Sequence, residues 1–413
     1  MTPHSRSFLL TTWDGGGTSP PELGVAKRLV DRGHTVHVLG DPTLVQDVQA
    51  AGCTFTPWSR APHRSSLDKE DDLLKDWEAE DPLDVLRRLR DQIMSGPASE
   101  FAADTAASIE TVHPDAVLAD AELFGSVIAA EAAGLPVAVL MPNQWTVPTP
   151  GIGDRAVRTF VERVVKAGLA DLNAARSDRG LVPLNAFFDQ ILNADRLLVL
   201  TSEAFDPASG FVPDNVRYVG PVLDDPAWVG SWTSPWPNDA AEPLVLVGLS
   251  SIYQNQGALL QRTIDALSAL PARAVVTLGR MLEPDDVSAS PNVTVVRSAP
   301  HSVLLADASL VITACGHGTV MKTLAAGVPI VCIPMGRDQD AIAARVAELG
   351  AGLVLPPSAS AEEIRAAVLE VLADESYTSN ARTLASTLSV EHAPLDVVLE
   401  LEDLVAQKSN DRD

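Results

Sequence analysis

Residues Thr313–Gln339 read TACGHGTVMKTLAAGVPIVCIPMGRDQ, and this stretch decides the fold. The branched apolar run Ser309–Thr313 leads into it and predicts a buried parallel strand. Val320–Ala326 predicts a helix that Gly327 ends, and Pro329–Pro334 predicts a second buried strand. The stretch therefore predicts a strand–turn–helix–strand unit of a parallel α/β sheet.

The turn that starts this helix contains Gly316 and Gly318 followed by the hydroxyl of Thr319. The first N–H groups of a helix have no partner inside the helix, and the helix dipole favours negative charge at the same end. This turn is therefore a candidate anion site. The alternative is an ordinary strand–helix connection whose glycines serve tight packing. Asp338 and Gln339, which follow the next strand, favour the ligand site.

Length and charge narrow the classes of function. A chain of 413 residues exceeds the size at which one hydrophobic core stops growing, so two domains are expected. The formal net charge of −25 argues against a nucleic-acid partner and against binding to anionic membranes. No apolar run is long enough to span a bilayer, and the N-terminal apolar segment is too short for a signal peptide. We therefore expect a cytoplasmic protein with no membrane partner.

The N-terminal part repeats the same kind of unit. A short strand at Phe8–Thr12 precedes the glycine-rich loop WDGGGTSPP and a helix at Glu22–Arg32. The loop lacks the GxGxxG spacing, so a dinucleotide site is only weakly indicated, with Asp41 near the position of the acidic residue such a site needs. Asp14 and Asp120 each follow a predicted strand. Ligands of parallel sheets bind at the carboxyl ends of strands, so both carboxylates are candidate site residues.

Strands alternate with helices along the whole chain, which predicts two doubly wound, Rossmann-like α/β domains facing across a cleft. We expect an N-terminal domain at 1–220, a linker rich in Pro and Trp at 221–243, and a second domain at 244–385. A C-terminal helix at 386–413 is expected to return to the N-terminal domain. The cysteines at 53, 315 and 332 suggest neither a disulfide framework nor a zinc site, and we expect no metal.

The combined motifs resemble the antibiotic and macrolide glycosyltransferases of the UDP-glycosyltransferase superfamily, which have the GT-B fold. The resemblance spans nearly the whole chain in the right order. It rests on Pro21, Arg32–Val36, Asp115–Asp120, Gly134–Pro136, Pro300–His301, Leu304–Leu305, Gly316–Thr319, Leu324–Pro329, Pro334 and Asp338–Gln339.

The resemblance implies an inverting, metal-independent transfer of a hexose or deoxyhexose from a UDP- or TDP-linked donor to a small hydrophobic natural product. It implies no separate cofactor, because the nucleotide sugar is a co-substrate. Phosphate contacts are implied for Ser251, Gly316, His317, Gly318 and Thr319. Asp338 and Gln339 are implied to bind sugar hydroxyls, and the segment that begins with Arg297 and Ser298 is implied to lie along the base.

Three residues depart from the family pattern. Ala314 stands where a His is usual, and either His317 or Arg337 is a candidate to replace that phosphate donor. Lys322 stands where many members have Glu, and a cation in the first turns of a helix is disfavoured unless it pairs with an anion. A diphosphate, a nearby carboxylate and a solvent-facing lysine all remain open for Lys322. Thr18 stands where the family has its catalytic His.

A threonine is no base near neutral pH unless another group activates it. Asp120 aligns with the carboxylate that usually orients the missing His, so it is the first candidate base. Asp14 is the second candidate, and Thr18 occupies the family's catalytic position. A carboxylate with its ordinary pKa is a poor base at neutral pH unless apolar burial raises that pKa. An acidic phenol or a carbon nucleophile as acceptor would relax this demand.

Two other functions remain open at this point. A non-catalytic or auxiliary GT-B protein would explain the missing histidines, and a nucleotide-sugar epimerase would need acidic and His groups around the donor sugar. Residues 58–100 and 143–190 are expected to line the acceptor pocket. The oligomeric state is expected to be a monomer or a homodimer.

Overall fold

The computed structural model describes residues 5–145, 147, 163–207, 212–237, 240–391 and 396–410. The chain divides into two compact units. The first unit comprises residues 1–222 together with 392–413, and the second comprises residues 223–391. Residues 221 and 222 of the expected linker thus belong to the first unit, and the rest of the linker belongs to the second.

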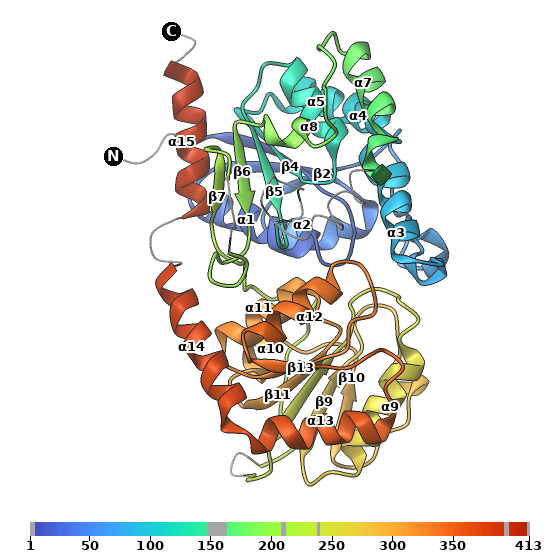
Figure 1. Cartoon of the computed structure of the whole chain (residues 1–413). Coiled ribbons are helices and arrows are strands. Elements are labelled where there is room, and N and C mark those ends of the chain that lie inside the picture. The colour runs from blue at the N-terminus through green and yellow to red at the C-terminus, as the bar shows by residue number, and fades with distance from the viewer. Residues whose placement is uncertain are drawn as a thin grey trace. The chain divides into compact units, whose positions relative to one another are not determined.

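The first unit is built on a sheet whose described strands are all parallel (Figure 1). In sheet order they are β3 (Thr54–Pro57), β2 (Thr35–Gly40), β1 (Ser7–Thr11), β4 (Ala116–Asp120), β5 (Val137–Met141), β6 (Arg196–Val199) and β7 (Val216–Tyr218). β1 lies between β2 and β4, where the strand order reverses. Loops that follow β1 and β4 therefore meet at a switch point, which is where open α/β sheets bind ligands.

Helices cover both faces of this sheet. One apolar layer joins side chains of the sheet to α1 (Ser19–Asp31), α2 (Val45–Ala50) and α15 (Val397–Asn410). The opposite layer joins the sheet to α4 (Ala98–Val112), α5 (Phe124–Ala132), α7 (Leu169–Asp178) and α8 (Asp189–Leu192). α3 (Pro82–Leu89) continues into a π-helical turn at Arg90–Met94. Short 3-10 turns occupy Pro42–Leu44, Lys69–Asp71 and Asp76–Glu78.

Gly125 shows how tightly helices pack in this unit. A Cβ atom at this position would lie 2.3 Å from the carbonyl oxygen of Ala98 and 2.6 Å from the Cβ of Phe101. α4 and α5 therefore meet backbone to backbone, and only glycine fits at the contact.

The second unit contains a sheet of parallel strands of its own (Figure 1). In sheet order the described strands are β10 (Val293–Val296), β9 (Arg273–Thr277), β8 (Leu244–Gly248), β11 (Ala308–Thr313), β12 (Ile330–Cys332) and β13 (Gly352–Val354). α9 (Gly257–Ser268) and α13 (Ala361–Ala373) share one apolar layer with the sheet. α10 (His301–Leu304) and the tryptophans at 232 and 236 belong to another layer on this sheet.

The stretch with which the sequence analysis began forms β11, α11 (His317–Ala325), β12 and the start of α12 (Gln339–Glu348). α11 packs against α14 (Glu375–Glu391), and a 3-10 turn occupies Pro284–Asp286. The prediction of two doubly wound, parallel α/β domains is confirmed.

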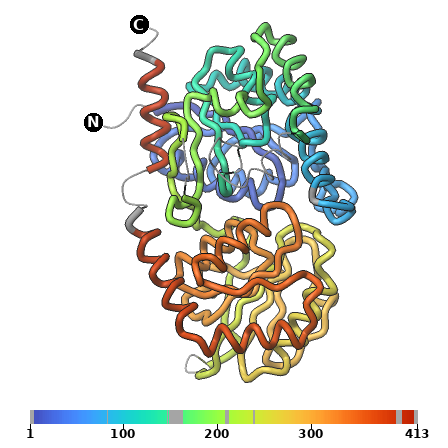
Figure 2. The backbone as a smooth tube through the Cα atoms, viewed as in Figure 1, coloured from blue at the N-terminus to red at the C-terminus, as the bar shows by residue number. Residues whose placement is uncertain are grey.

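The C-terminal helix α15 belongs to the first unit, and the backbone trace in Figure 2 shows it beside β6 and β7. Its apolar side chains Leu401 and Leu404 are buried against the sheet. Glu402 accepts from the side chains of Arg32 (3.2 Å) and His34 (2.9 Å). In the described ranges, no helix is both long enough and apolar enough to cross a membrane.

Candidate functional site

The glycine turn of the second unit connects β11 to α11. Ala314 and Cys315 are fully buried behind it, and Gly316 is the residue that caps the helix. The backbone N–H groups of Thr319 and Val320 donate to the carbonyl of Gly316 at 3.0 and 3.1 Å, which closes the first helical turn. The first turn of α11 contains no acidic side chain. Nothing in that turn therefore offsets the positive end of the helix dipole.

Gly316 and Gly318 do not serve packing. A Cβ atom built on either residue meets no atom within 4 Å, in contrast with Gly125. Neither glycine is among the residues whose φ is positive, so the local backbone does not require glycine either. The tight-packing alternative is therefore not supported. The two glycines leave space in front of the helix N-terminus, as an approaching ligand would require.

The turn itself is held in an unusual backbone conformation. Cys315 has a φ of 67°, in the left-handed region that few residues other than glycine occupy. Its thiol is buried against the carbonyl of Thr313 at 3.8 Å. A hydrogen bond with Cys332 on β12 and burial both raise the pKa of the Cys315 thiol, so the thiol stays neutral. The buried thiol holds the strained turn against the sheet.

Other predicted donor residues lie in loops at the same edge of this sheet. Ser251 follows β8, and its carbonyl accepts from the N–H of Arg280 at 3.3 Å. Arg297 follows β10, forms an ion pair with Glu283, and accepts the N–H of Gly279 on its carbonyl at 3.0 Å. Next to it, Ser298 accepts the N–H of Gly230 on its hydroxyl at 3.4 Å.

Gln339 is the most constrained of the predicted sugar-binding residues. It is buried at the start of α12, its Oε1 accepts the N–H of Met335 at 2.7 Å, and its Nε2 donates to Gln254 at 3.1 Å. This amide ties the loop after β12 to the loop after β8. Asp338 occupies the N-cap position of α12 without a side-chain cap hydrogen bond, and Arg337 before it has a φ of 59°, so this loop is also strained.

The structure decides among the alternatives for Lys322. Its ammonium group donates to Asp225 at 2.9 Å, and both side chains are mostly buried, with 13% and 15% exposed. Asp225 also accepts from the N–H (3.1 Å) and hydroxyl (2.5 Å) of Ser302 at the start of α10. The nearby carboxylate is thus the partner, and the solvent-facing alternative is wrong. Burial acts to raise the pKa of Asp225, but the charge of Lys322 and the hydrogen bonds from Ser302 and Lys322 together outweigh it, so the pKa is lowered and Asp225 stays ionised.

His301, one of the residues on which the family resemblance rests, lies near Lys322 and Asp225. Burial, followed by the charge of Lys322, lowers the pKa of His301 to about 4. The imidazole is therefore neutral near pH 7, and its Nε2 hydrogen-bonds to the hydroxyl of Thr277 at 3.1 Å. A Cβ on Gly248 would lie 3.0 Å from the ring, so the end of β8 is shaped to admit it. His301 holds the loop after β10 onto the sheet.

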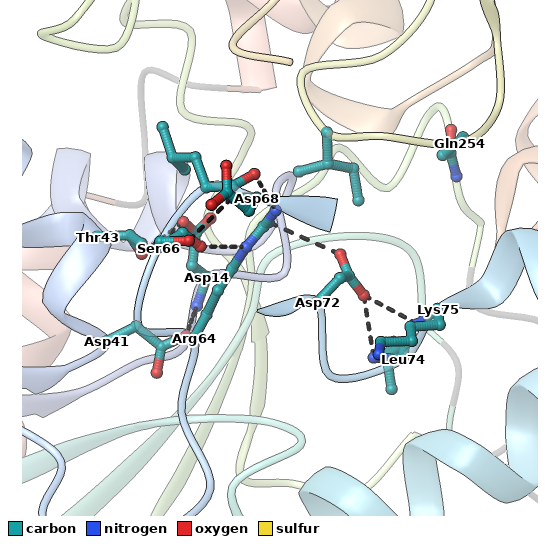
Figure 3. Close-up of polar contacts among 12 residues, drawn as sticks. Asp14, Asp41, Thr43, Arg64, Ser66, Asp68, Asp72, Leu74, Lys75 and Gln254 are labelled. Carbon is teal, nitrogen blue, oxygen red and sulfur yellow. Dashed lines mark hydrogen bonds and ion pairs between the residues drawn. The ribbon is translucent and has the colours of Figure 1, made fainter. Parts of the chain in front are cut away.

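In the first unit, Asp14 belongs to a polar network at the carboxyl edge of the sheet (Figure 3). Its N–H donates to Asp41 at 2.9 Å, and its carboxylate accepts the hydroxyl of Thr43 at 2.7 Å. Figure 3 shows the side chain of Arg64 between Asp14 and Asp72. Arg64 is buried, donates to the carbonyls of residues 66 and 67, and lies 3.7 Å from a carboxylate oxygen of Asp72. Asp14 thus helps to organise the surrounding loops.

Asp41 is fully buried, and burial raises its pKa to about 7 despite hydrogen bonds from the backbones of Asp14 and Arg64. This side chain joins three loops to one another: the loop after β1, the loop after β2, and the segment that contains Arg64.

Asp120 ends β4 and is also fully buried. Its Oδ1 accepts the N–H of Glu122 at 2.7 Å, and burial raises its pKa to about 6. Glu22 of α1, a buried carboxyl, hydrogen-bonds to it. Glu22 also accepts the hydroxyl of Thr12 at 2.5 Å. The structure thus brings the first candidate base together with a carboxyl group that sequence reasoning missed.

Thr18 precedes α1 and is partly exposed. Its hydroxyl does not cap the helix, and donates instead to the carbonyl of Trp13 at 3.3 Å. Within the described part of the chain, no base hydrogen-bonds to this hydroxyl. Part of the predicted acceptor region, residues 146 and 148–162, lies outside the described residues. Within the described part, Ser59 and Arg60 line a hollow with His37 and Arg179.

Three charged residues of these sites were missed: Glu22, Arg64 and Asp225. A signal existed for Glu22, because it lies three and seven residues before Val25 and Leu29 and so falls on the apolar stripe of its helix. Arg64 and Asp225 gave no such signal, because both lie in irregular segments.

No group of three or more His, Cys, Asp or Glu side chains in the described residues is arranged to hold a metal ion.

Residues 261–404 match the family model of the erythromycin biosynthesis protein CIII-like, C-terminal domain. Among curated proteins, 4′-demethylrebeccamycin synthase of Lentzea aerocolonigenes is 28% identical, over 96% of this chain and 98% of that protein. Demethyllactenocin mycarosyltransferase of Streptomyces fradiae is 26% identical, over 90% of this chain and 80% of that protein.

Solved structures confirm the fold. The glycotransferase of kitacinnamycin superposes with a TM-score of 0.78 at 23% identity, over 98% of this chain and 99% of that one. Glycosyltransferase VinC, solved in complex with dTDP, superposes with a TM-score of 0.71 at 20% identity, over 98% of this chain and 100% of that one. The similarities cover both units, so the resemblance inferred from the motifs is confirmed.

Proposed function

We propose, from the premise that this chain is an antibiotic- and macrolide-type glycosyltransferase with the GT-B fold, that it transfers a hexose or deoxyhexose from a UDP- or TDP-linked donor to a small hydrophobic natural product. Transfer inverts the anomeric centre and uses no metal ion. The observation that carries this proposal is the open glycine turn at the N-terminus of α11.

In this proposal the donor diphosphate binds at this turn. The N–H groups at the start of α11 and the hydroxyl of Thr319 bind the phosphate oxygens, and Ser251 adds a contact from the loop after β8. As the glycosidic bond to phosphate breaks, negative charge develops on the diphosphate. The positive end of the helix dipole stabilises that charge where it appears, so it lowers the barrier rather than only binding the donor.

The roles of the remaining donor residues follow from their loops. Asp338 binds hydroxyls of the donor sugar, and Gln339 uses its remaining amide hydrogen for the same purpose while its two hydrogen bonds hold it in place. Arg297 and Ser298 lie along the base. Lys322, which is paired with Asp225, fixes α11 to α10 and is not a phosphate ligand. His317 and Arg337 remain the candidates to replace the missing phosphate histidine.

Asp120 is the proposed proton acceptor. Its pKa of about 6 removes the objection that an ordinary carboxylate is too weak a base, because the best catalytic pKa lies near the working pH. Asp14 is the second candidate, and its hydrogen bonds with Thr43 and Asp41 favour a role in shaping the loop instead. Thr18 binds or positions the acceptor through its partly exposed hydroxyl.

The experiment is a direct assay with UDP- and dTDP-linked hexoses and a panel of phenolic, indolic and polyketide acceptors, with product detected by mass spectrometry. Donor binding is measured separately as a shift in melting temperature. Product that disappears in Asp338→Ala, with the melting temperature of the free protein unchanged, is the expected result. A matched control is Asp340→Ala, which changes an exposed carboxylate two residues away.

The other outcomes bear on the alternatives. Donor binding without turnover on every acceptor would favour the auxiliary protein, and conversion of the donor sugar without an acceptor would favour the epimerase. A melting temperature that no nucleotide sugar changes would contradict donor binding.

A further inference from the structure

The buried carboxyl groups of Glu22 and Asp120 interact with each other at the switch point of the first sheet. Glu22 reaches it from α1 and Asp120 from the end of β4, and both side chains are 0% exposed. One oxygen of each group has an ordinary donor: Oε2 of Glu22 accepts from Thr12, and Oδ1 of Asp120 accepts from the N–H of Glu122. The other two oxygens, Oε1 and Oδ2, find no N–H or O–H donor among the described residues.

These two orphaned oxygens belong to groups that hydrogen-bond to each other. A hydrogen bond between two carboxyl groups requires a proton, because ionised carboxylates only accept. Two adjacent carboxylates buried away from water would also repel each other strongly. One shared proton removes both problems, since it satisfies Oε1 and Oδ2 together and leaves the pair with a single negative charge.

The surroundings decide which residue carries the proton. Burial is the main cause that raises the pKa of Glu22 well above its ordinary value, and the negative charges of Asp120 and Glu122 raise it further. Burial also raises the pKa of Asp120, to about 6, but the hydrogen bonds from Glu22 and from the N–H of Glu122 oppose this rise. Oε1 of Glu22 therefore bears the proton, and Oε2, which accepts from Thr12, is its carbonyl oxygen.

We propose that Glu22 is a positioning residue, a neutral acid that donates a hydrogen bond to Asp120 and maintains Asp120 as the one carboxylate of the pair. The shared proton rests on the burial of both groups, their two unpaired oxygens and the hydrogen bond between them, whereas its role in transfer rests on the proposed function. In that role the acceptor hydroxyl gives its proton to Asp120 as its oxygen bonds to the sugar, the bond to diphosphate breaks, and Glu22 keeps its own proton. The pair, then neutral, returns one proton to water.

The first test needs no substrate. Infrared difference spectra at pH 7 separate the C=O band of a buried protonated carboxyl from the bands of carboxylates. We expect Glu22→Gln to remove one such band and Asp120→Asn to retain it. Asp41→Asn serves as the control, because Asp41 is buried to the same degree as Glu22 and Asp120 and its substitution should remove a different band. A band retained in Glu22→Gln would overturn the proposal. If Glu22→Gln does not fold, Asp120→Asn decides, since loss of the Glu22 band there would place the proton on Asp120.

The second test measures the pH profile of kcat/KM for one donor–acceptor pair. In Glu22→Gln the amide still donates to Asp120, so the acid limb of the profile should stay where it is. In Glu22→Leu the hydrogen-bond donor to Asp120 is lost, so the acid limb of the profile should shift to higher pH by about one unit. On the acid side, kcat/KM should therefore be about tenfold lower. A purely structural role would lower the rate without moving the limb, and that result would overturn the positioning role.

The two tests keep the proposals distinguishable. If no donor and acceptor give product with the unsubstituted enzyme, the proposed function fails while the infrared spectra still decide on the shared proton. If product forms but the infrared band does not depend on Glu22, the shared proton is wrong and sugar transfer stands.

Discussion

The helices α1 and α11 each begin after an interior strand of a parallel sheet, β1 and β11 respectively, yet their N-termini have opposite surroundings. At α1 the acidic side chain of the first turn, Glu22, is fully buried and is joined there by Asp120. At α11 no acidic side chain lies in the first turn, and Gly316 and Gly318 face open space. The comparison teaches that the chain itself supplies the N-terminus of α1 with a buried carboxyl pair of one negative charge, whereas the N-terminus of α11 is left for a negatively charged ligand.

The largest expected effect comes from making α11 resemble α1. Gly318→Asp places a carboxylate where the diphosphate is proposed to bind, and should weaken binding of UDP or dTDP by about a hundredfold or more, or ~3 kcal/mol. The free energy of unfolding should not fall, because an acid in the first turn favours the helix. Titration calorimetry measures the binding.

Gly318→Ala is the matched control, since it adds a Cβ into open space without a charge. Its binding should remain within about threefold of the unsubstituted protein. Equal nucleotide affinity in the Asp variant would show that α11 is not the anion site.

The next effect concerns the buried carboxyls of the first unit. The pKa of Asp41 is raised to about 7 in the folded state, above its value in the unfolded chain. The folded protein therefore binds more protons, and the stabilisation present below pH 4 is lost as the pH rises through 7. Relative to Asp41→Asn, the unsubstituted protein should lose about 2 to 4 kcal/mol of unfolding free energy over this window.

Urea denaturation at pH 4.5, 6 and 7.5 measures this difference. Asp31→Asn, which changes an exposed carboxylate of α1, serves as the control and should show no such slope. Parallel curves for the unsubstituted protein and Asp41→Asn would contradict the raised pKa.

A smaller effect on the free energy of unfolding is expected at the Lys322–Asp225 ion pair of the second unit. Lys322→Met leaves Asp225 without its cation and Asp225→Asn leaves Lys322 without its anion, so each should lower the unfolding free energy by about 1 to 3 kcal/mol. The double variant should lose less than the sum of the two. A double-mutant cycle from thermal unfolding gives the coupling, and additive losses would show that the pair is not coupled.

The smallest effect is expected at Thr18, which the family pattern makes a catalytic position. Its hydroxyl makes one long hydrogen bond and does not cap α1, so Thr18→Ala should change the unfolding free energy by less than about 0.5 kcal/mol. The rate of transfer should change by less than about tenfold, because among the described residues the hydroxyl hydrogen-bonds to a carbonyl and not to a base that could activate it. A rate loss of a thousandfold would return Thr18 to the centre of the mechanism.

The sequence by itself determined the two parallel sheets, the strand–turn–helix units and the order of the donor motifs. These follow from local periodicity and glycine placement, which adjacent residues encode together. It also brought Asp14 and Asp120 to the carboxyl ends of strands, because parallel strands end at one edge.

Only the tertiary structure decided how the charges pair. Lys322 meets Asp225 across 97 residues of chain, and Glu22 meets Asp120 across two elements, so neither contact leaves a local pattern. The open space before Gly316 and Gly318, and the burial that raises the pKa of Asp120, depend on which distant atoms approach each group. Burial and proximity set the chemistry here, and both are properties of the packed chain.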